Sequence, residues 1–294
     1  MNQKNIKYKL PEIDSLWDYS DPVRTEQKFR ELCVKAEEIL DSNYLLELKT
    51  QIARTQSLQL KFQEAHAILN DIELDISANQ IIPYIRYYLE RGRTFNSANF
   101  KKEASEQFVL AYDLALKNKE DFYAVDAAYM LANSEPNKAM NWNLKALELC
   151  ENSKNHKTKK WLGSLYNNIG WAYHGNGKFI NALELFEKAL TFKKEKKDEK
   201  GVFIAKWTIA RTFRSLDRIE EALELQCELL RAIKAGKVKT DGYVYEEIGE
   251  CLLLKNDMLK ASRYFKLAFD LLSQNKWIRT YEPARLKRLK KMIK

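Results

Sequence analysis

The chain has 294 residues, of which 45% are apolar and 31% are charged, a balance that supports a packed core and excludes general disorder. It holds only 9 glycines and 5 prolines, whereas ordinary usage would give about 21 and 15, so sandwiches, barrels and glycine-loop nucleotide folds are disfavoured. The net charge of +9 is uneven, because residues 276–294 carry +7 and residues 1–150 carry −4. The composition predicts a helical protein with a basic end.

The cysteines and the hydropathy pattern describe the cellular setting. No CxxC pair and no dense cysteine framework occurs, which is typical of reduced thiols rather than disulfides or a zinc site. No signal peptide and no membrane span is read from the sequence, so a cytoplasmic location is expected. The four cysteines are Cys33, Cys150, Cys227 and Cys251.

The N-terminal segment, residues 1–22, has no helical period and contains Pro11 and Pro22. We expect an extended arm here. Asp21 before Pro22 is a good helix start, and residues 23–40 are predicted to form a capping helix. Three apolar residues of the arm are expected to pack on the first helix pair: Leu16, Trp17 and Tyr19.

A repeat runs through the middle of the chain. Six alanines open similar segments at spacings of 35 to 43 residues, and a glycine or alanine lies twelve residues before each. Small residues at this offset mark the close crossing of two antiparallel helices, and large apolar residues lie three or four positions away. The alanines are Ala65, Ala104, Ala139, Ala182, Ala222 and Ala261. The small partners are Ala53, Gly92, Ala127, Gly170, Ala210 and Gly249.

One helix pair cannot bury its apolar stripe alone, but stacked pairs can. Six or seven pairs use the length of residues 23–275 and leave no room for another domain. The clearest unit, residues 166–190, resembles the tetratricopeptide repeat. The matching residues are Ile169, Gly170, Tyr173, Gly177, Phe179, Ala182, Phe186 and Ala189. The resemblance implies an all-α, right-handed α-solenoid with terminal capping helices.

Two departures from the family pattern are visible. The usual period of about 34 residues is near 39 here, and the proline that usually closes each repeat is missing. The resemblance therefore indicates a long-period form of the repeat. It implies a non-enzymatic scaffold or adaptor that binds a protein or an extended peptide on its concave face. The fold alone does not specify which partner is bound.

The register of the family places a set of polar and aromatic residues on this concave face. Asparagine both donates to and accepts from a peptide backbone, arginine binds carboxylates in bidentate fashion, and tryptophan is a rigid apolar anchor. The alternative is that the tryptophans pack between neighbouring helices and the arginines are solvated. The candidate peptide-binding residues are Arg93, Tyr129, Asn167, Asn168, Trp171, Trp207, Arg211 and Arg214.

The resemblance also suggests two more specific functions. A clamp for chaperone C-terminal tails is not supported, because only Asn168 falls on a clamp position. A peptide-sensing regulator of the long-repeat group is the second reading, although the first 22 residues are too short for the effector domain that such regulators often carry. A homo-oligomer is left open.

Catalytic signatures are missing from the sequence. No phosphate-binding glycine loop, nucleophile elbow or HExxH motif occurs, and none of His66, His156 and His174 has a partner at metal-ligand spacing. We therefore expect neither an enzyme nor a bound metal or cofactor.

The basic C-terminal segment, residues 276–294, is predicted to end in a capping helix over residues 281–293. One interpretation is structural: the helix covers the last apolar face, and its lysines are exposed to solvent. The sharper reading, docking to nucleic acid or a membrane, is disfavoured because no aromatic residue follows Tyr281. The basic residues concerned are Arg285, Lys287, Arg288, Lys290, Lys291 and Lys294.

Overall fold

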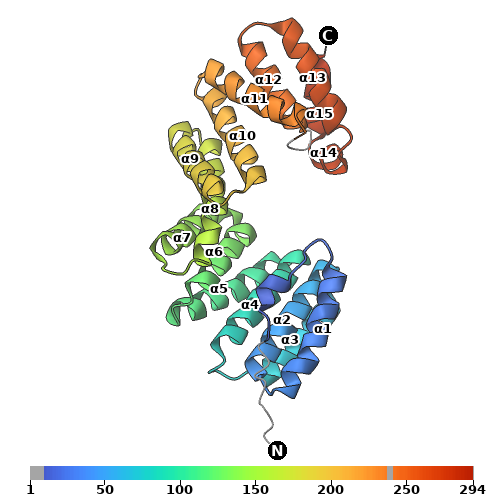
Figure 1. The fold of residues 1–294 in the computed structure, drawn as a ribbon, viewed down its shortest axis with the longest axis vertical. Helices are drawn as coiled ribbons and strands as arrows, with labels where there is room; N and C mark the ends of the chain where they lie inside the picture. The colour runs from blue at the N-terminus through green and yellow to red at the C-terminus, as the bar shows by residue number, and fades with distance from the viewer. Residues whose placement is uncertain (1–9, 237–240, 294) are drawn as a thin grey trace, which may run out of the picture. The chain divides into compact units, whose positions relative to one another are not determined.

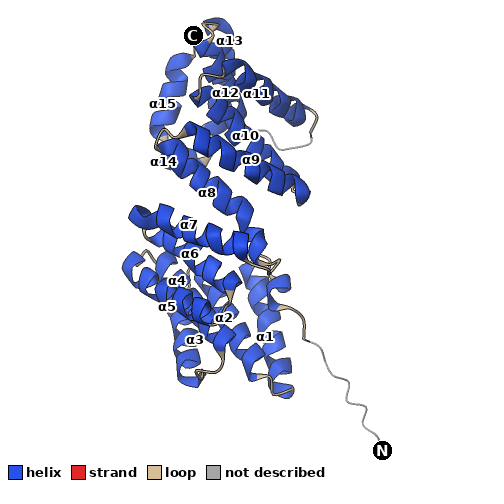
Figure 2. Cartoon of the chain, turned by 90° about the vertical axis from the view of Figure 1, so that its left-hand side faces the viewer, coloured by secondary structure: helices blue, strands red, loops and turns tan. Residues whose placement is uncertain are grey.

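The computed structural model describes residues 10–236 and 241–293. Within these ranges every regular element is a helix (Figure 1; Figure 2), which confirms the predicted all-α fold. The chain divides into two compact units, one ending at Trp161 and the other beginning at Leu162. Each unit has its own apolar cores. None of the helices described is long and apolar enough to span a membrane.

In the first unit, a short 3-10 helix and a capping helix precede three antiparallel pairs, α2 with α3, α4 with α5 and α6 with α7. The first helices of neighbouring pairs also pack on one another. The elements are η1 (Ile13–Leu16), α1 (Pro22–Glu38), α2 (Ser42–Leu58), α3 (Phe62–Asp75), α4 (Ile81–Ser97), α5 (Lys101–Lys117), α6 (Asp121–Ser134), η2 (Pro136–Lys138), α7 (Ala139–Asn152) and η3 (Thr158–Trp161).

The second unit repeats the scheme with the pairs α8 with α9, α10 with α11 and α12 with α13, and ends in two short helices. The elements are α8 (Leu162–Gly175), α9 (Phe179–Glu195), α10 (Glu199–Ser215), α11 (Ile219–Lys234), α12 (Gly242–Leu254), α13 (Met258–Leu272), α14 (Lys276–Tyr281) and α15 (Pro283–Met292).

The same tight turn joins the two helices in all but one of the described pairs. One residue takes a left-handed conformation, and the amide after it donates to the carbonyl five residues back, as Lys61 does to Gln56 at 2.9 Å, a common helix ending. Because four of these five positions are not glycine, the repeat needs few glycines. The left-handed residues are Leu60, Asn99, Gly177, Asp217 and Asn256. In the exception, Pro136–Lys138 links α6 to α7.

The small residues predicted at the helix crossings lie in the core. In three pairs the crossing residue is glycine, and the facing residue of the second helix is a buried phenylalanine: Gly92 with Phe108, Gly170 with Phe186, and Gly249 with Phe265. In the other three pairs the crossing residue is alanine, and the residue at the phenylalanine position is smaller or polar. These residues are Leu69, Asn143 and Gln226. A glycine is therefore required where a phenyl ring fills the crossing.

Gln226 is an unsatisfied polar residue in this core. Its side chain is fully buried, and among the described residues neither its amide oxygen nor its amide nitrogen has a hydrogen-bond partner. Burying an amide without a partner costs free energy that an apolar side chain does not lose. We expect Gln226→Leu, which copies Leu69 of the first pair, to raise the free energy of unfolding by about 1 kcal/mol in urea titrations.

The control for this substitution is Gln27→Leu on the exposed face of α1. A surface change of this kind should leave the free energy of unfolding within about 0.5 kcal/mol. A Gln226→Leu protein less stable than the natural chain would show that the buried amide makes bonds that stabilise the fold.

The two ends of the chain are held by specific contacts. Ile13 of the arm is buried against Phe29 and the α2 residues Leu48 and Ile52, and the Asp21 side chain caps α1. Within the basic C-terminal segment, α15 lies inside the range predicted for the last helix, residues 281–293, and α14 precedes it. The chain breaks at Glu282 and restarts with proline at the first position of α15, where a missing amide proton costs least.

Candidate functional site

The first unit contains a cavity of about 460 Å³ on the face formed by its first helices, α2, α4 and α6. The described part of the N-terminal segment, residues 10–21, borders the cavity with Glu12, Asp14, Trp17 and Tyr19, and the η3 region closes another side. We call residues 10–21 the arm, and the cavity with the helix faces that line it the inner groove. Charged and aromatic side chains both line the groove, so it suits a polar ligand with an apolar part.

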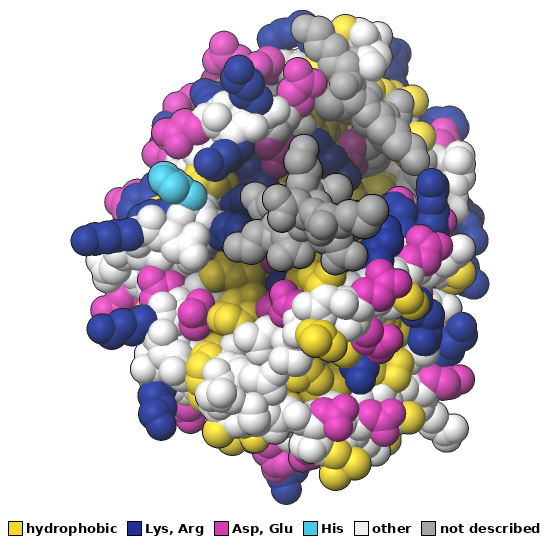
Figure 3. Space-filling model, turned by 60° about the horizontal axis from the view of Figure 1, so that its bottom comes forward, with side chains coloured by type: hydrophobic (Ala, Val, Ile, Leu, Met, Phe, Trp, Pro, Cys, Tyr) yellow, Lys and Arg dark blue, Asp and Glu magenta, His cyan; other side chains and the backbone are white. Residues whose placement is uncertain are grey.

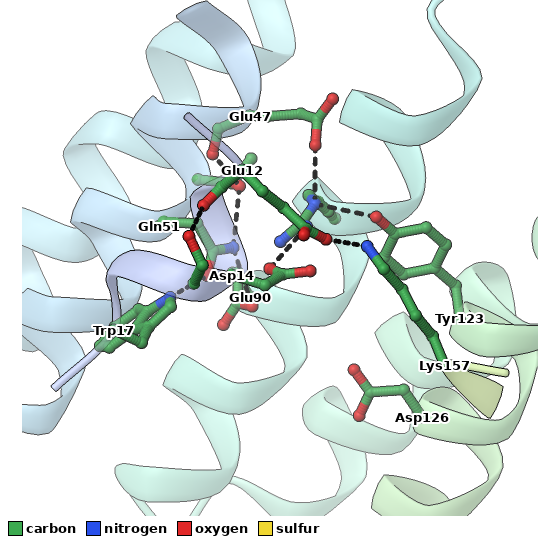
Figure 4. Close-up of polar contacts among 12 residues, drawn as sticks. Glu12, Asp14, Trp17, Glu47, Gln51, Glu90, Tyr123, Asp126 and Lys157 are labelled. Carbon is green, nitrogen blue, oxygen red and sulfur yellow. Dashed lines mark hydrogen bonds and ion pairs between the residues drawn. The ribbon is translucent and has the colours of Figure 1, made fainter. Parts of the chain in front are cut away.

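Arg86 of α4 is the most enclosed cation of the groove. Its guanidinium binds the carboxylates of Asp14 at 2.8 Å and Glu47 at 2.9 Å, and donates to the Tyr123 hydroxyl at 3.1 Å (Figure 4). Burial alone would lower the pKa of Arg86, but its oxygen partners outweigh this effect and raise the pKa. Arg86 thus remains charged and fixed in direction, as recognition of a carboxylate requires.

Arg93, one of the predicted peptide-binding residues, lies in the wall of the same groove. It bridges Glu90 at 2.6 Å and Asp126 at 2.5 Å, and these carboxylates raise its pKa although burial alone would lower it. Arg54 lies 3.8 Å from Glu90, and burial lowers its pKa. The guanidinium of Arg93 is therefore held by two carboxylates of the wall.

The arm makes side-chain contacts across the groove. Glu12 pairs with Lys157, Asp14 binds Arg86, and the Trp17 indole donates to Gln51 at 3.0 Å (Figure 4). The aromatic side of the groove lies elsewhere, where Tyr129, also predicted to bind peptide, packs on Trp161 with ring centroids 5.0 Å apart. The groove thus has a charged part, bridged by the arm, and an aromatic part beside the exposed Lys160.

The other predicted peptide-binding residues lie in the second unit. Trp171 packs on Phe186 and lies 6.1 Å from Trp207, whose ring is 6.0 Å from Tyr243. Both tryptophans are partly buried. This arrangement is the one expected if the tryptophans pack between neighbouring first helices, the alternative to peptide binding given in the sequence analysis.

The two predicted arginines of α10 share one buried acid. Arg211 and Arg214 both bind the carboxylate of Glu247 on α12, whose side chain is 3% exposed. Asn167 and Asn168 on α8 are partly exposed, and among the described residues no hydrogen bond to either side-chain amide is found. In this unit the asparagines, rather than the arginines, have free bonding capacity.

The basic C-terminal residues divide into two groups. Arg285 binds Glu246 at 2.6 Å and covers the Tyr243 ring, and Arg288 binds Glu250. Both acids are buried on α12, so the two arginines neutralise the charges of these acids. Lys287, Lys290 and Lys291 are exposed, and Lys294 lies outside the described residues.

In the described parts of the chain, no group of three or more His, Cys, Asp and Glu side chains could hold a metal ion. Burial raises the pKa of Cys150 and Cys251 to about 12 and that of Cys33 to about 11. Burial therefore favours the protonated form of these thiols at neutral pH. Burial and nearby arginines lower the pKa of both His66 and His174.

The repeated pairs, with small residues at their crossings, define the chain as an α-helical repeat protein. Residues 162–196, which form α8 and α9, match a sequence model described as tetratricopeptide repeat. This segment of the protein is thus a tetratricopeptide repeat, as its sequence suggested. No curated protein matches it in sequence.

Solved structures share this fold. RapI in its apo form has a TM-score of 0.69 at 12% identity, over 90% of this chain and 76% of RapI. A signal transduction ATPase from Pyrococcus horikoshii with a tetratricopeptide repeat sensor has a TM-score of 0.72 at 15% identity, over 90% of this chain and 42% of that one. NprR in complex with its cognate peptide NprX has a TM-score of 0.53 at 14% identity, over 94% and 80%.

Sequence reasoning found part of the inner groove. The family register placed Arg93 and Tyr129 on the inner face, and both line the cavity. The candidate residues did not include Arg86, the most enclosed cation, or Asp14 of the arm, which binds it. The available signal was an acidic and aromatic arm beside a face rich in arginine.

Proposed function

We propose that the chain is a non-enzymatic peptide-binding protein and that the inner groove of the first unit is its binding site. The observation that carries the proposal is a 460 Å³ cavity walled by three successive first helices, the face on which stacked repeats form extended binding surfaces. The fold it shares with NprR, which was solved with a peptide bound, supports the proposal in general terms.

The chemistry of the groove favours an extended peptide over a small apolar molecule. The guanidinium groups of Arg86 and Arg93 are fixed in advance by carboxylates, which lowers the ordering cost of binding. Tyr129 and Trp161 offer a flat apolar surface, and aromatic residues of this kind dominate binding energy at interfaces. A peptide would bind with a polar group near Arg86 and an apolar side chain near Tyr129.

The predicted face of the second unit is a secondary part of this proposal. Asn167 and Asn168 retain side-chain bonding capacity, whereas Arg211 and Arg214 are bound to Glu247. We propose that this face contributes contacts to the peptide backbone through the asparagines.

Docking of the basic C-terminus to anionic surfaces is a weaker candidate function, because Arg285 and Arg288 already bind Glu246 and Glu250. On the face drawn in Figure 3, basic side chains are interspersed with acidic ones.

The test is selection of displayed twelve-residue peptides on the full-length chain, followed by measurement of their dissociation constants by fluorescence anisotropy. Lys160 is exposed at the groove and Tyr129 supplies its aromatic surface. We expect Tyr129→Ala to weaken selected peptides by at least tenfold, the effect of losing an interface hot spot. Lys160→Glu should weaken acidic peptides about fivefold, as an exposed charge pair would.

The matched control is Lys154→Glu, which makes the same charge reversal at an exposed residue that does not line the groove. Its affinities should equal those of the natural chain. Selected peptides that bind the Tyr129→Ala and Lys160→Glu proteins as well as the natural chain would place the binding site elsewhere, and the proposal would be wrong.

A further inference from the structure

We infer that the inner groove recognises acidic peptide segments that carry an aromatic residue three positions after a carboxylate, and that the arm occupies the groove as an exchangeable internal ligand. The inference rests on the proposed function and names the ligand class and the regulation of the same site. The arm supplies the pattern, since Asp14 is followed by Trp17 and preceded by Glu12.

The arm contacts the groove as a bound peptide would. Apart from the one turn of η1 it is not part of a helix, and its bonds to the groove come from side chains: Asp14 to Arg86, Glu12 to Lys157 and Trp17 to Gln51. The ring of Tyr19 stacks on Trp17 at 4.7 Å and also borders the cavity. Asp14 thus makes a charge-assisted bond to the groove, and aromatic residues follow it in the arm.

The charges of the groove call for an acidic occupant. Outside the arm, the basic side chains of the lining outnumber the acidic ones by five to two, or five to three with Glu47, which binds Arg86. The arm adds Glu12 and Asp14 to this surface and so cancels the remaining excess of +2. The basic residues are Arg54, Arg86, Arg93, Lys157 and Lys160. A peptide lacking carboxylates would leave this excess unpaired in a partly enclosed site.

The arm also leaves part of the groove open, which gives a competing peptide a place to start. The cavity extends from the arm to Tyr129, Trp161 and the exposed Lys160, and among the described residues none of these three forms a hydrogen bond or ion pair with the arm. An incoming acidic peptide can bind there first and then replace the groove contacts of Asp14 and Trp17 one at a time, while the buried Ile13 keeps the arm attached to the first core. Stepwise exchange avoids exposing the arginines of the groove all at once.

The test uses a fluorescein-labelled peptide of residues 10–21 added to full-length protein. The natural chain should bind it weakly, because the tethered arm competes at a high effective concentration. Asp14→Asn in the protein weakens the tethered arm while Glu47 still pairs with Arg86, so the fold is kept. We expect this protein to bind the natural peptide at least tenfold more tightly, and a peptide carrying Asp14→Asn to lose at least tenfold.

The matched control is Asp18→Asn in the protein, which removes one charge from the same arm. The Asp18 carboxylate bonds to Ser20 within the arm, so the affinity for the peptide should equal that of the natural chain. Equal binding to the natural, Asp14→Asn and Asp18→Asn proteins would overturn the inference, and so would the absence of binding to all three.

A second measurement separates this inference from the proposed function. A selected peptide that depends on Tyr129 is added to the natural chain, and amide hydrogen exchange is followed in residues 12–19. Faster exchange in this segment on saturation means that the arm leaves the groove and supports the inference. Unchanged exchange means that the arm stays in place, which overturns the inference while the proposed peptide site still stands.

Discussion

Replacement of Arg93 by methionine is expected to lower the free energy of unfolding by about 3–5 kcal/mol, the cost of removing one partner from a buried charge cluster. Glu90 and Asp126 would keep their charges in the wall of the inner groove without their shared cation. Gln51 and Arg54 approach Glu90 at 3.3 and 3.8 Å, whereas Asp126 has no second ion pair within the described parts of the chain. Chemical denaturation in urea at neutral pH measures the effect.

The control for Arg93→Met is Arg30→Met, which removes the same charge from an exposed arginine paired with the half-buried Glu26 on α1. Exposed pairs of this kind contribute about 0–1 kcal/mol, so the two substitutions should differ by several-fold in their effect. Should Arg93→Met leave stability unchanged but abolish peptide binding, Arg93 would be a ligand-binding arginine, as the sequence suggested, rather than a structural one.

The fold could be predicted because the signal is repeated. The crossing alanines and glycines recur at one offset, and the structure places them in the cores of successive pairs. Each pair buries its stripe only against its neighbours, so the local pattern and the global fold specify the same arrangement. The end of the chain was less predictable, because the break at Pro283 depends on how α14 buries Ile278 in the last core.

The candidate site was less predictable, because register places a side chain on a face without stating what it binds. Arg93 and Asp126 are 33 residues apart, as are Arg214 and Glu247. Arg285 and Glu246 are 39 apart. In the first two cases a cation of one first helix meets an acid of the next first helix, and in the third a cation of the terminal helix α15 meets an acid of α12. All three partners lie about one repeat apart, and such pairs could have been sought in the sequence. The arm could not, since its place depends on tertiary contacts alone.

Gly170→Ala is expected to lower the free energy of unfolding by about 1–2 kcal/mol, although alanine is the better helix former by about 1 kcal/mol. An added Cβ would lie 2.5 Å from Cε1 of Phe186, whose ring is fully buried at the crossing of α8 and α9. Overpacking of a core costs about 1–3 kcal/mol, so the clash outweighs the gain in helix propensity.

The rescue experiment uses the pairing found elsewhere in the chain. Phe186→Leu in the Gly170→Ala protein recreates the combination of Ala53 with Leu69 in the first pair. We expect the double variant to be more stable than the sum of the two single changes predicts, with a coupling energy of about 1 kcal/mol in a double-mutant cycle. Additive effects would show that replacing the Phe186 ring does not relieve the strain caused by Ala at position 170. The choice of glycine or alanine at each crossing would then not follow the size of the facing residue.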